Sequence, residues 1–212
     1  MLMTKVKEKS KKGKERITID TLVKGLSDPL FLLQKKQTVR HVEFILEMID
    51  YELSTKYKRI VTQKIEHRIK SPDSIARKLI KKGYEVSFEN AIQKLNDSDD
   101  VYKIAELLKQ QKDFILIKEK DYIKNPKKSG YQSLHLILDI PLIYKDTTQL
   151  QRVEIQIRTV AMDFWAAVDN QICYKKDPED MKKSEEELKN YSTVISTMDK
   201  QMLELRKRVE KM

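Results

Sequence analysis

The fold is decided by two stretches of alternating sequence, Gly130-Tyr131-Gln132-Ser133-Leu134-His135 and Arg152-Val153-Glu154-Ile155-Gln156-Ile157-Arg158-Thr159. Alternation of apolar and polar side chains with a period of two predicts β-strands over 131–140 and 152–159. The polar faces of these strands carry Tyr131, Ser133, His135, Glu154, Gln156 and Arg158. If the strands are neighbours with these faces aligned, the six side chains meet on one side of a sheet. The alternative is a polar face that is merely solvated.

The rest of the chain is rich in predicted helices, since only 4 Gly and 5 Pro interrupt 212 residues. Apolar spacing and capping signals predict helices over 27–59, 72–82, 90–95, 101–110 and 160–174, and a further strand over 114–118. We expect the helix over 160–174 to pack on the apolar face of the sheet through Phe164, Val168 and Ile172. The predicted fold class is α+β, a mixed β-sheet with surrounding helices and long N- and C-terminal helices.

The segment 177–212 is predicted to be an amphipathic helix. Its apolar residues recur in steps of three and four, at Leu188, Tyr191, Ile195, Met198, Met202, Leu205, Val209 and Met212. Such a heptad seam favours self-association, and we expect a homotetramer; the alternative is packing on the chain's own domain. The predicted organisation is a basic disordered leader over 1–16, N-terminal helices over 17–60, a central domain over 61–176, and this C-terminal oligomerisation helix.

Composition excludes several classes of protein. The apolar runs are far shorter than the roughly 20 residues that span a bilayer, which excludes a membrane protein. The start of the chain has no apolar secretory signal, and Cys173 is the single cysteine, so we expect a cytoplasmic protein without disulfides. One Cys and three His cannot form a thiolate zinc cage. The formal charge of +10 favours a phosphate-bearing partner, either a nucleotide or a nucleic acid.

A second cluster of functional residues surrounds the start of the helix predicted over 72–82. Ser74 and Lys78 are four residues apart, so they share a face near the positive end of the helix, and Arg68 and Lys70 come just before it. A polyphosphate would fit this arrangement. The alternative is that Ser71-Pro72 is an ordinary helix cap with solvated basic residues around it.

These motifs, taken together, resemble the small alarmone synthetases of the Rel/Spo synthetase superfamily. The matching residues are Arg68-Ile69-Lys70 with Ser74 and Lys78, Gly130 to His135, Glu154 to Thr159, and Met162-Asp163-Phe164-Trp165-Ala166. The resemblance spans about 18–176 and makes the central domain a synthetase catalytic domain. It implies a GTP pyrophosphokinase of the stringent stress response, which transfers the β,γ-pyrophosphate of ATP to the 3′-hydroxyl of GDP or GTP and releases AMP.

The resemblance also implies a role for each matching residue. Arg68, Lys70, Ser74 and Lys78 match residues that hold the ATP phosphates. Tyr131 matches the residue that stacks on guanine, and the other acceptor-binding positions are Lys127, His135, Gln156 and Asp163. Glu154 matches the carboxylate that activates the 3′-hydroxyl and binds Mg²⁺, and Asp97 matches the second metal ligand. Phosphoryl chemistry requires such a set, because cations must neutralise the phosphate oxygens while a carboxylate removes the proton of the attacking hydroxyl.

The sequence departs from the family immediately after Asp97. There the family has an Asp-Ile-Ala-Gly-x-Arg segment that leads into a central strand, whereas this chain continues directly with Ser98-Asp99-Asp100. Removal of a central strand should leave its neighbours unpaired, so we expect either that residues are missing from the sequence or that the enzyme is inactive.

Two functional hypotheses therefore remain. The first is an active synthetase without hydrolase activity. The second is a catalytically degenerate nucleotide- or RNA-binding relative. Glu154 favours the synthetase, because a carboxylate weakens an RNA-binding surface and is required for metal-assisted transfer. We expect neither a nucleic-acid nor a membrane partner.

Overall fold

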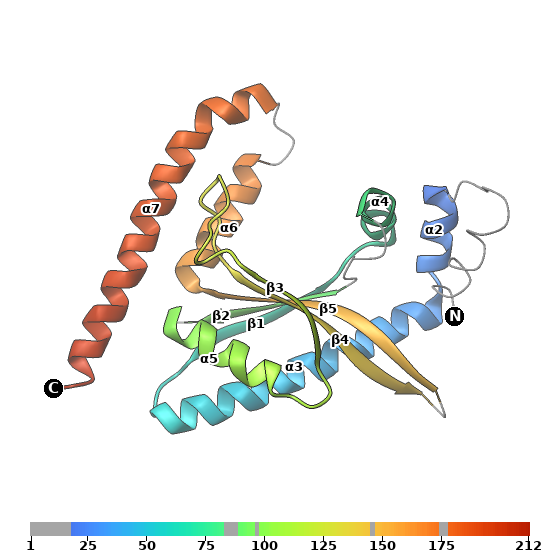
Figure 1. Cartoon of the computed structure of the whole chain (residues 1–212), viewed down its shortest axis with the longest axis horizontal. Coiled ribbons are helices and arrows are strands. Elements are labelled where there is room, and N and C mark those ends of the chain that lie inside the picture. The colour runs from blue at the N-terminus through green and yellow to red at the C-terminus, as the bar shows by residue number, and fades with distance from the viewer. Residues whose placement is uncertain (1–17, 83–88, 96–97, 145–146, 174–177) are drawn as a thin grey trace.

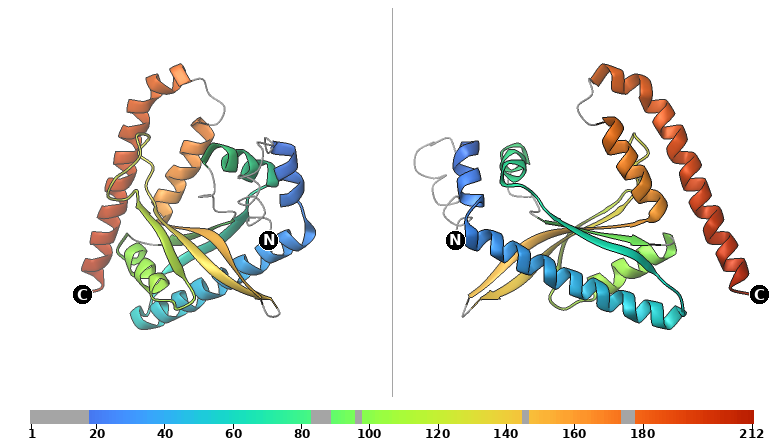
Figure 2. Two further views of the ribbon diagram at one scale, coloured as in Figure 1. Left: turned by 45° about the vertical axis from the view of Figure 1, so that its right-hand side comes forward. Right: turned by 180° about the vertical axis from the view of Figure 1, so that it is seen from behind.

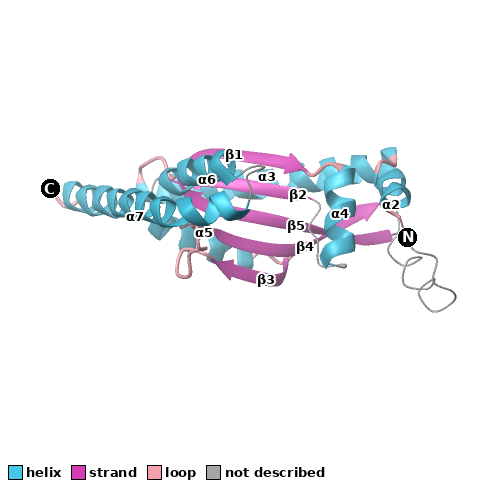
Figure 3. Cartoon of the chain, turned by 90° about the horizontal axis from the view of Figure 1, so that it is seen from above, coloured by secondary structure: helices cyan, strands magenta, loops and turns pink. Residues whose placement is uncertain are grey.

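The structure is a computed structural model that describes residues 18–82, 89–95, 98–144, 147–173 and 178–212 (Figure 1). The predicted leader over 1–16 lies outside these residues. Five strands form one sheet in the order β1-β2-β5-β4-β3, which Figure 3 shows from above. The strands are β1 (Thr62–Ile69), β2 (Glu89–Leu95), β3 (Ile115–Asp121), β4 (Leu134–Tyr144) and β5 (Thr147–Thr159). β2 and β5 run parallel and the other neighbours antiparallel, so the predicted mixed α+β fold is confirmed.

The helices cover both faces of the sheet. They are α2 (Ile19–Leu26), α3 (Pro29–Tyr57), α4 (Pro72–Lys82), α5 (Ser98–Lys109), α6 (Val160–Cys173) and α7 (Pro178–Val209). Figures 1 and 2 show α3 and α5 on one side of the sheet, and α4 and α6 on the other. None of the helices in the described ranges contains a segment long and apolar enough to cross a membrane.

The main hydrophobic core lies between α3, α5 and the apolar face of the sheet. Helix α3 begins where its sequence predicts, because the Asp28 carboxylate accepts a hydrogen bond from the Phe31 amide at 2.9 Å and Pro29 occupies the first turn. Its buried residues recur at helical spacing, and Leu46 is 0% exposed. They contact buried side chains of α5 and of the strands, among them Ile104, Leu136, Ile155 and Ile157.

The prediction of a helix over 90–95 is wrong, because these residues belong to β2. This strand lies between β1 and β5 and hydrogen-bonds to both, so it fills the central position that the departure after Asp97 was expected to leave empty. Pairing of the backbone groups of two neighbouring strands outweighs a weak local preference for helix. The expectation of unpaired neighbours is therefore corrected.

One side chain of β2 fits its buried position poorly. Gln93 is 0% exposed, and its amide nitrogen donates to the Thr62 hydroxyl at 2.9 Å. Its amide oxygen is buried without a hydrogen-bond partner among the described residues. An apolar residue is the usual occupant of such a position, so β2 has an atypical sequence for a central strand.

The expectation that the helix over 160–174 packs on the apolar face of the sheet is also wrong. Helix α6 follows β5 directly and lies on the opposite side from α3 and α5 (Figure 1). The apolar face is already covered by α3 and α5. Helix α6 instead packs against α7 and the other face of the sheet. Its residues Met162, Trp165 and Ala166 are buried, whereas Phe164 is 59% exposed. Helix α6 consequently lies at one end of the polar face.

Helix α7 packs beside α6 and still exposes most of its heptad seam (Figure 1). Leu188 and Leu203 are buried, so the alternative of packing on the chain's own domain holds for one face. The exposed seam residues are Tyr191, Met198, Met202, Leu205, Val209 and Met212, and Val194 beside them is exposed as well. A second apolar face thus remains available on the same helix.

Candidate active site

The register of the sheet brings the two polar strand faces together. β4 and β5 are antiparallel neighbours in which His135 pairs with Gln156, and Ile137 pairs with Glu154. On the other side of β5, Asn90 of β2 pairs with Glu154. The alignment predicted from the alternating sequence is therefore confirmed, and its polar side chains lie on the side of the sheet that carries α4 and α6.

The side chains of Tyr131, His135 and Glu154 are linked in that order by two hydrogen bonds. The Tyr131 hydroxyl lies 2.9 Å from Nε2 of His135, and Nδ1 of His135 lies 2.7 Å from Oε1 of Glu154. The second carboxylate oxygen, Oε2, lies 3.7 Å from Nζ of Lys70. His135 and Lys70 are buried, at 6% and 5% exposure. Lys70 thus joins the cluster although it comes from the far edge of the sheet, at the end of β1.

Burial and neighbouring charges determine the protonation states of Tyr131, His135 and Glu154. Burial raises the pKa of Tyr131, so its hydroxyl stays protonated and donates. Burial lowers the pKa of His135, so the neutral ring donates through Nδ1–H to Glu154 and accepts at Nε2. Burial alone would raise the pKa of Glu154, but the hydrogen bond from His135 and the positive charges of Lys70 and Lys120 hold it well below its usual range. Glu154 is therefore a carboxylate at neutral pH.

Cations surround the ring of Tyr131. The Lys127 ammonium lies 4.3 Å from the ring centroid and the Arg158 guanidinium carbon 5.8 Å from it. The ring of Tyr122 meets it edge-on, at a centroid distance of 6.0 Å. Both cations therefore make cation–π contacts with this ring, and Tyr131 is 9% exposed.

A second ionic group lies beside this cluster and contains two residues that the sequence did not reveal. Arg158 donates to the amide oxygen of Gln156 and lies 3.4 Å from Oδ1 of Asp163. Nζ of Lys94 lies 2.9 Å from Oδ2 of Asp163 and 2.9 Å from Oε2 of Glu66. Sequence reasoning missed Lys94 and Glu66 because it placed Lys94 on a helix. No clear signal marks these residues in the sequence, because Ile92 shares the parity of Asn90 and Lys94 and interrupts any polar alternation.

The remaining predicted residues lie at the other end of the site or outside the described residues. Ser74 is half-buried and Lys78 exposed on α4, at the end of the sheet away from α6 (Figure 1). Arg68 is exposed on β1 and lines a hollow of about 440 Å³ together with Lys36, Arg40 and Glu43 of α3. The structure thus joins Lys70 to Glu154, whereas Arg68 lines a hollow shared with α3, and Ser74 and Lys78 lie on α4. Asp97 lies outside the described residues.

Within the described residues, no group of three His, Cys, Asp or Glu side chains could hold a metal ion on its own. A Mg²⁺ ion commonly takes one or two carboxylates and completes its shell with water and substrate phosphates. Glu154 can supply one such carboxylate, because it is ionised and its side chain is 16% exposed.

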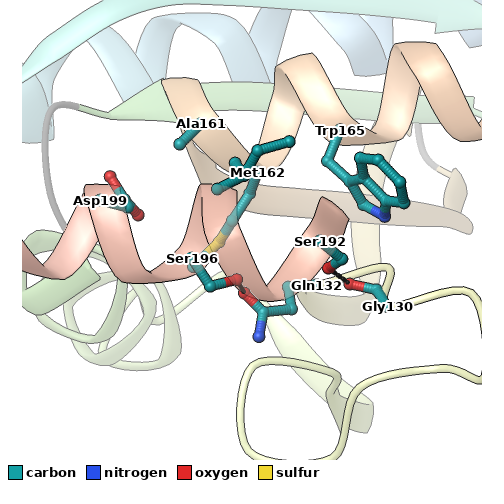
Figure 4. Close-up of a pocket in the computed structure, with 9 residues that line it drawn as sticks. Gly130, Gln132, Ala161, Met162, Trp165, Ser192, Ser196 and Asp199 are labelled. Atoms are coloured by element: carbon teal, nitrogen blue, oxygen red, sulfur yellow. Dashed lines mark hydrogen bonds between the residues drawn. The ribbon is translucent and has the colours of Figure 1, made fainter. Parts of the chain in front are cut away.

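One enclosed space beside residues 130–132 is too small for an organic substrate. Figure 4 shows it between α6, α7 and residues 130–132, where it encloses about 10 Å³. This volume holds about one water molecule. Residues 130 and 132 also line a larger, open hollow of about 840 Å³, together with Lys127, Lys128 and residues of α7 such as Lys189.

Comparisons with known proteins show which family this chain resembles. The pattern described as "Region found in RelA / SpoT proteins" matches residues 67–179. GTP pyrophosphokinase YwaC of Bacillus subtilis is 37% identical over 159 residues, which cover 69% of this chain and 76% of that protein.

Solved structures give the same result. Small alarmone synthetase 2 of Bacillus subtilis has a TM-score of 0.75 and 32% identity, covering 84% of this chain and 97% of that chain. Small alarmone synthetase 1 of the same organism, bound to its product pppGpp, has a TM-score of 0.76 and 29% identity, covering 85% and 96%. Because the family pattern matches more than half of its length and YwaC is 37% identical over 69% of it, this chain belongs to the RelA/SpoT family.

Proposed function

We propose that this protein is a GTP pyrophosphokinase that makes ppGpp or pppGpp. It transfers the β,γ-pyrophosphate of ATP to the 3′-hydroxyl of GDP or GTP and releases AMP. The observation that carries the proposal is the ionised Glu154, held between the imidazole of His135 and the ammonium of Lys70. The names of the relative YwaC and of the pppGpp-bound structure support the same reaction.

In this proposal Glu154 is the general base. Its carboxylate takes the proton of the 3′-hydroxyl while the 3′-oxygen bonds to the β-phosphorus of ATP and the bond from that phosphorus to the bridging α,β-oxygen breaks. His135 holds the carboxylate through one oxygen, which leaves the other to face the hydroxyl and Lys70. Lys70 lies where negative charge develops on the transferred group, so it stabilises the transition state.

The two nucleotides bind at opposite ends of this centre. The ring of Tyr131 stacks on guanine, Lys127 and His135 contact the acceptor phosphates, and Gln156 and Asp163 contact the acceptor nucleoside. The ATP phosphates lie toward Arg68, Lys70, Ser74 and Lys78, near the N-terminal end of α4. This division is supported by the positions of α4 and α6 at the two ends of the polar face (Figure 1).

The cofactor we propose is Mg²⁺, with Glu154 as a ligand from the described residues and Asp97 as the second ligand implied by the resemblance. The ion would supply charge neutralisation at the phosphates. We further propose that the protein acts in the cytoplasm, where both nucleotides are abundant. It self-associates through the exposed faces of α7 and α3, where Met202 is 66% and Phe44 57% exposed, as a homotetramer.

A direct assay tests this function. Purified protein with Mg²⁺, ATP and GDP is expected to release AMP and ppGpp in equal amounts. A second candidate, a nucleotide-binding relative without turnover, is favoured by one observation: Asn90 occupies the β2 position beside Glu154, in a chain that lacks the family's Asp-Ile-Ala-Gly-x-Arg segment. Binding of GDP without any AMP would establish this candidate and refute the synthetase.

A further inference from the structure

The loop that carries Tyr131 is held by the C-terminal helix. The Ser192 hydroxyl of α7 donates to the carbonyl oxygen of Gly130 at 2.7 Å, and the Ser196 hydroxyl donates to the amide oxygen of Gln132 at 2.9 Å (Figure 4). Ser192 is 5% exposed, so its hydrogen bond is shielded from water. A segment about sixty residues away in the sequence therefore holds the backbone before Tyr131, at Gly130, and the side chain after it, at Gln132.

The contact between Ser192 and Gly130 leaves no spare room. Gly130 has a φ of +79°, and a Cβ atom added to it would lie 2.3 Å from both Cβ and Oγ of Ser192. The loop is also closed by its own hydrogen bonds, from the Gly130 amide to the Lys127 carbonyl at 2.8 Å and from the Lys127 amide to the Tyr131 carbonyl at 3.1 Å. A displacement of Gly130 would therefore move Lys127 and Tyr131 together.

We propose that Ser192 is a positioning residue for the acceptor nucleotide, acting through the Gly130 backbone on Tyr131 and Lys127. This inference rests on the proposed function, since it assigns Tyr131 and Lys127 to the acceptor. It makes α7 a part of the acceptor-binding half of the site. Helix α4, with Ser74 and Lys78, lies at the far end of the sheet from α7 (Figure 1), so Ser192 does not act on ATP binding.

The experiment compares Ser192→Ala with the matched control Thr193→Ala. Thr193 is the next residue on α7, is exposed, and its hydroxyl donates only to the Lys189 carbonyl of its own helix, at 2.9 Å. Loss of the Ser192 hydrogen bond is expected to raise the KM and the calorimetric Kd for GDP about threefold to tenfold. The KM for ATP stays unchanged, and the control matches the unsubstituted protein in both values.

Equal values of the GDP constants in Ser192→Ala and the control would overturn the proposal. So would an equal rise in the constants for GDP and ATP, because a merely structural role affects both substrates. If the unsubstituted protein binds GDP without producing AMP, the proposed reaction fails, whereas the Kd for GDP still decides the role of Ser192.

A pair of substitutions at the contact tests the packing directly. Gly130→Ala introduces the clash with Ser192 and is expected to weaken GDP binding more than Ser192→Ala does. Adding Ser192→Gly removes both atoms that clash, so the double variant is expected to recover part of the lost affinity. Recovery would identify the clash with Ser192, because the strain of an alanine at a φ of +79° is the same in the single and the double variant.

Discussion

Replacement of Glu154 by Gln removes the general base and preserves the shape of the site. The amide oxygen of glutamine can still accept the hydrogen bond from Nδ1 of His135, now 2.7 Å from the carboxylate, so the Tyr131–His135 pair stays in place. What is lost is the negative charge beside Lys70 and the ability to take a proton.

The expected loss of kcat follows from the usual contribution of a general base. General-base catalysis contributes about 10²- to 10⁴-fold, so kcat should fall by that factor, which corresponds to about 2.7 to 5.4 kcal/mol of transition-state stabilisation. The Kd for GDP should change less than about threefold, because the substitution leaves Tyr131 and Lys127 in place. The hydrogen bond from His135 to residue 154 becomes neutral, but it does not involve the residues proposed to bind the base.

The assay measures AMP release at saturating ATP and GDP, with GDP affinity determined separately by calorimetry. Glu119→Gln is the control, because Glu119 is an exposed glutamate of β3 that pairs with Lys109 and lies outside the site. Retention of more than about a tenth of kcat by Glu154→Gln would contradict the role of general base, since the smallest contribution expected is about 10²-fold.

Four further outcomes are expected. Leu46→Ala, at a side chain that is 0% exposed, should lower the free energy of unfolding by about 2 to 5 kcal/mol in denaturant titration; a change below 1 kcal/mol would contradict its place in the core. Gln93→Leu should raise the denaturation midpoint, because it removes a buried amide oxygen without a partner among the described residues; a lower midpoint would argue against its place on a buried central strand. Met198→Lys with Met202→Lys should reduce the mass measured by light scattering, and an unchanged mass would exclude α7 from the interface. Stability should fall with acidification, because Glu154 has its pKa lowered from 4.5 to about 2, so its contribution is complete above about pH 4.5 and is lost toward pH 2; Glu154→Gln should show a flatter curve.

The strands β4 and β5 and the helix α3 could be predicted from local sequence. Alternation placed His135 and Glu154 on a shared polar face, and the register confirms it. Asp28 and Pro29 marked the start of α3 within two residues of the predicted bound. These features depend on side-chain periodicity and capping, which act over a few residues.

The strand β2 could not be predicted in this way. Its residues Glu89–Leu95 have no strong β preference, and Gln93 is an unusual occupant of a buried central position. Only the unpaired edges of β1 and β5 explain why this segment is a strand. Lys94 and its contacts with Asp163 and Glu66 were missed for the same reason.

The sequence by itself determined the α+β class, the two alternating strands and the identity of the residues that meet around Glu154, because periodicity and residue chemistry are local properties. The tertiary structure alone decided three further features. These are the strand character of β2, the side of the sheet on which α6 lies, and the hydrogen bond from Ser192 to the Gly130 carbonyl. Each depends on which surfaces and backbone groups remain unsatisfied after the other elements have packed, and that competition involves segments far apart in the chain.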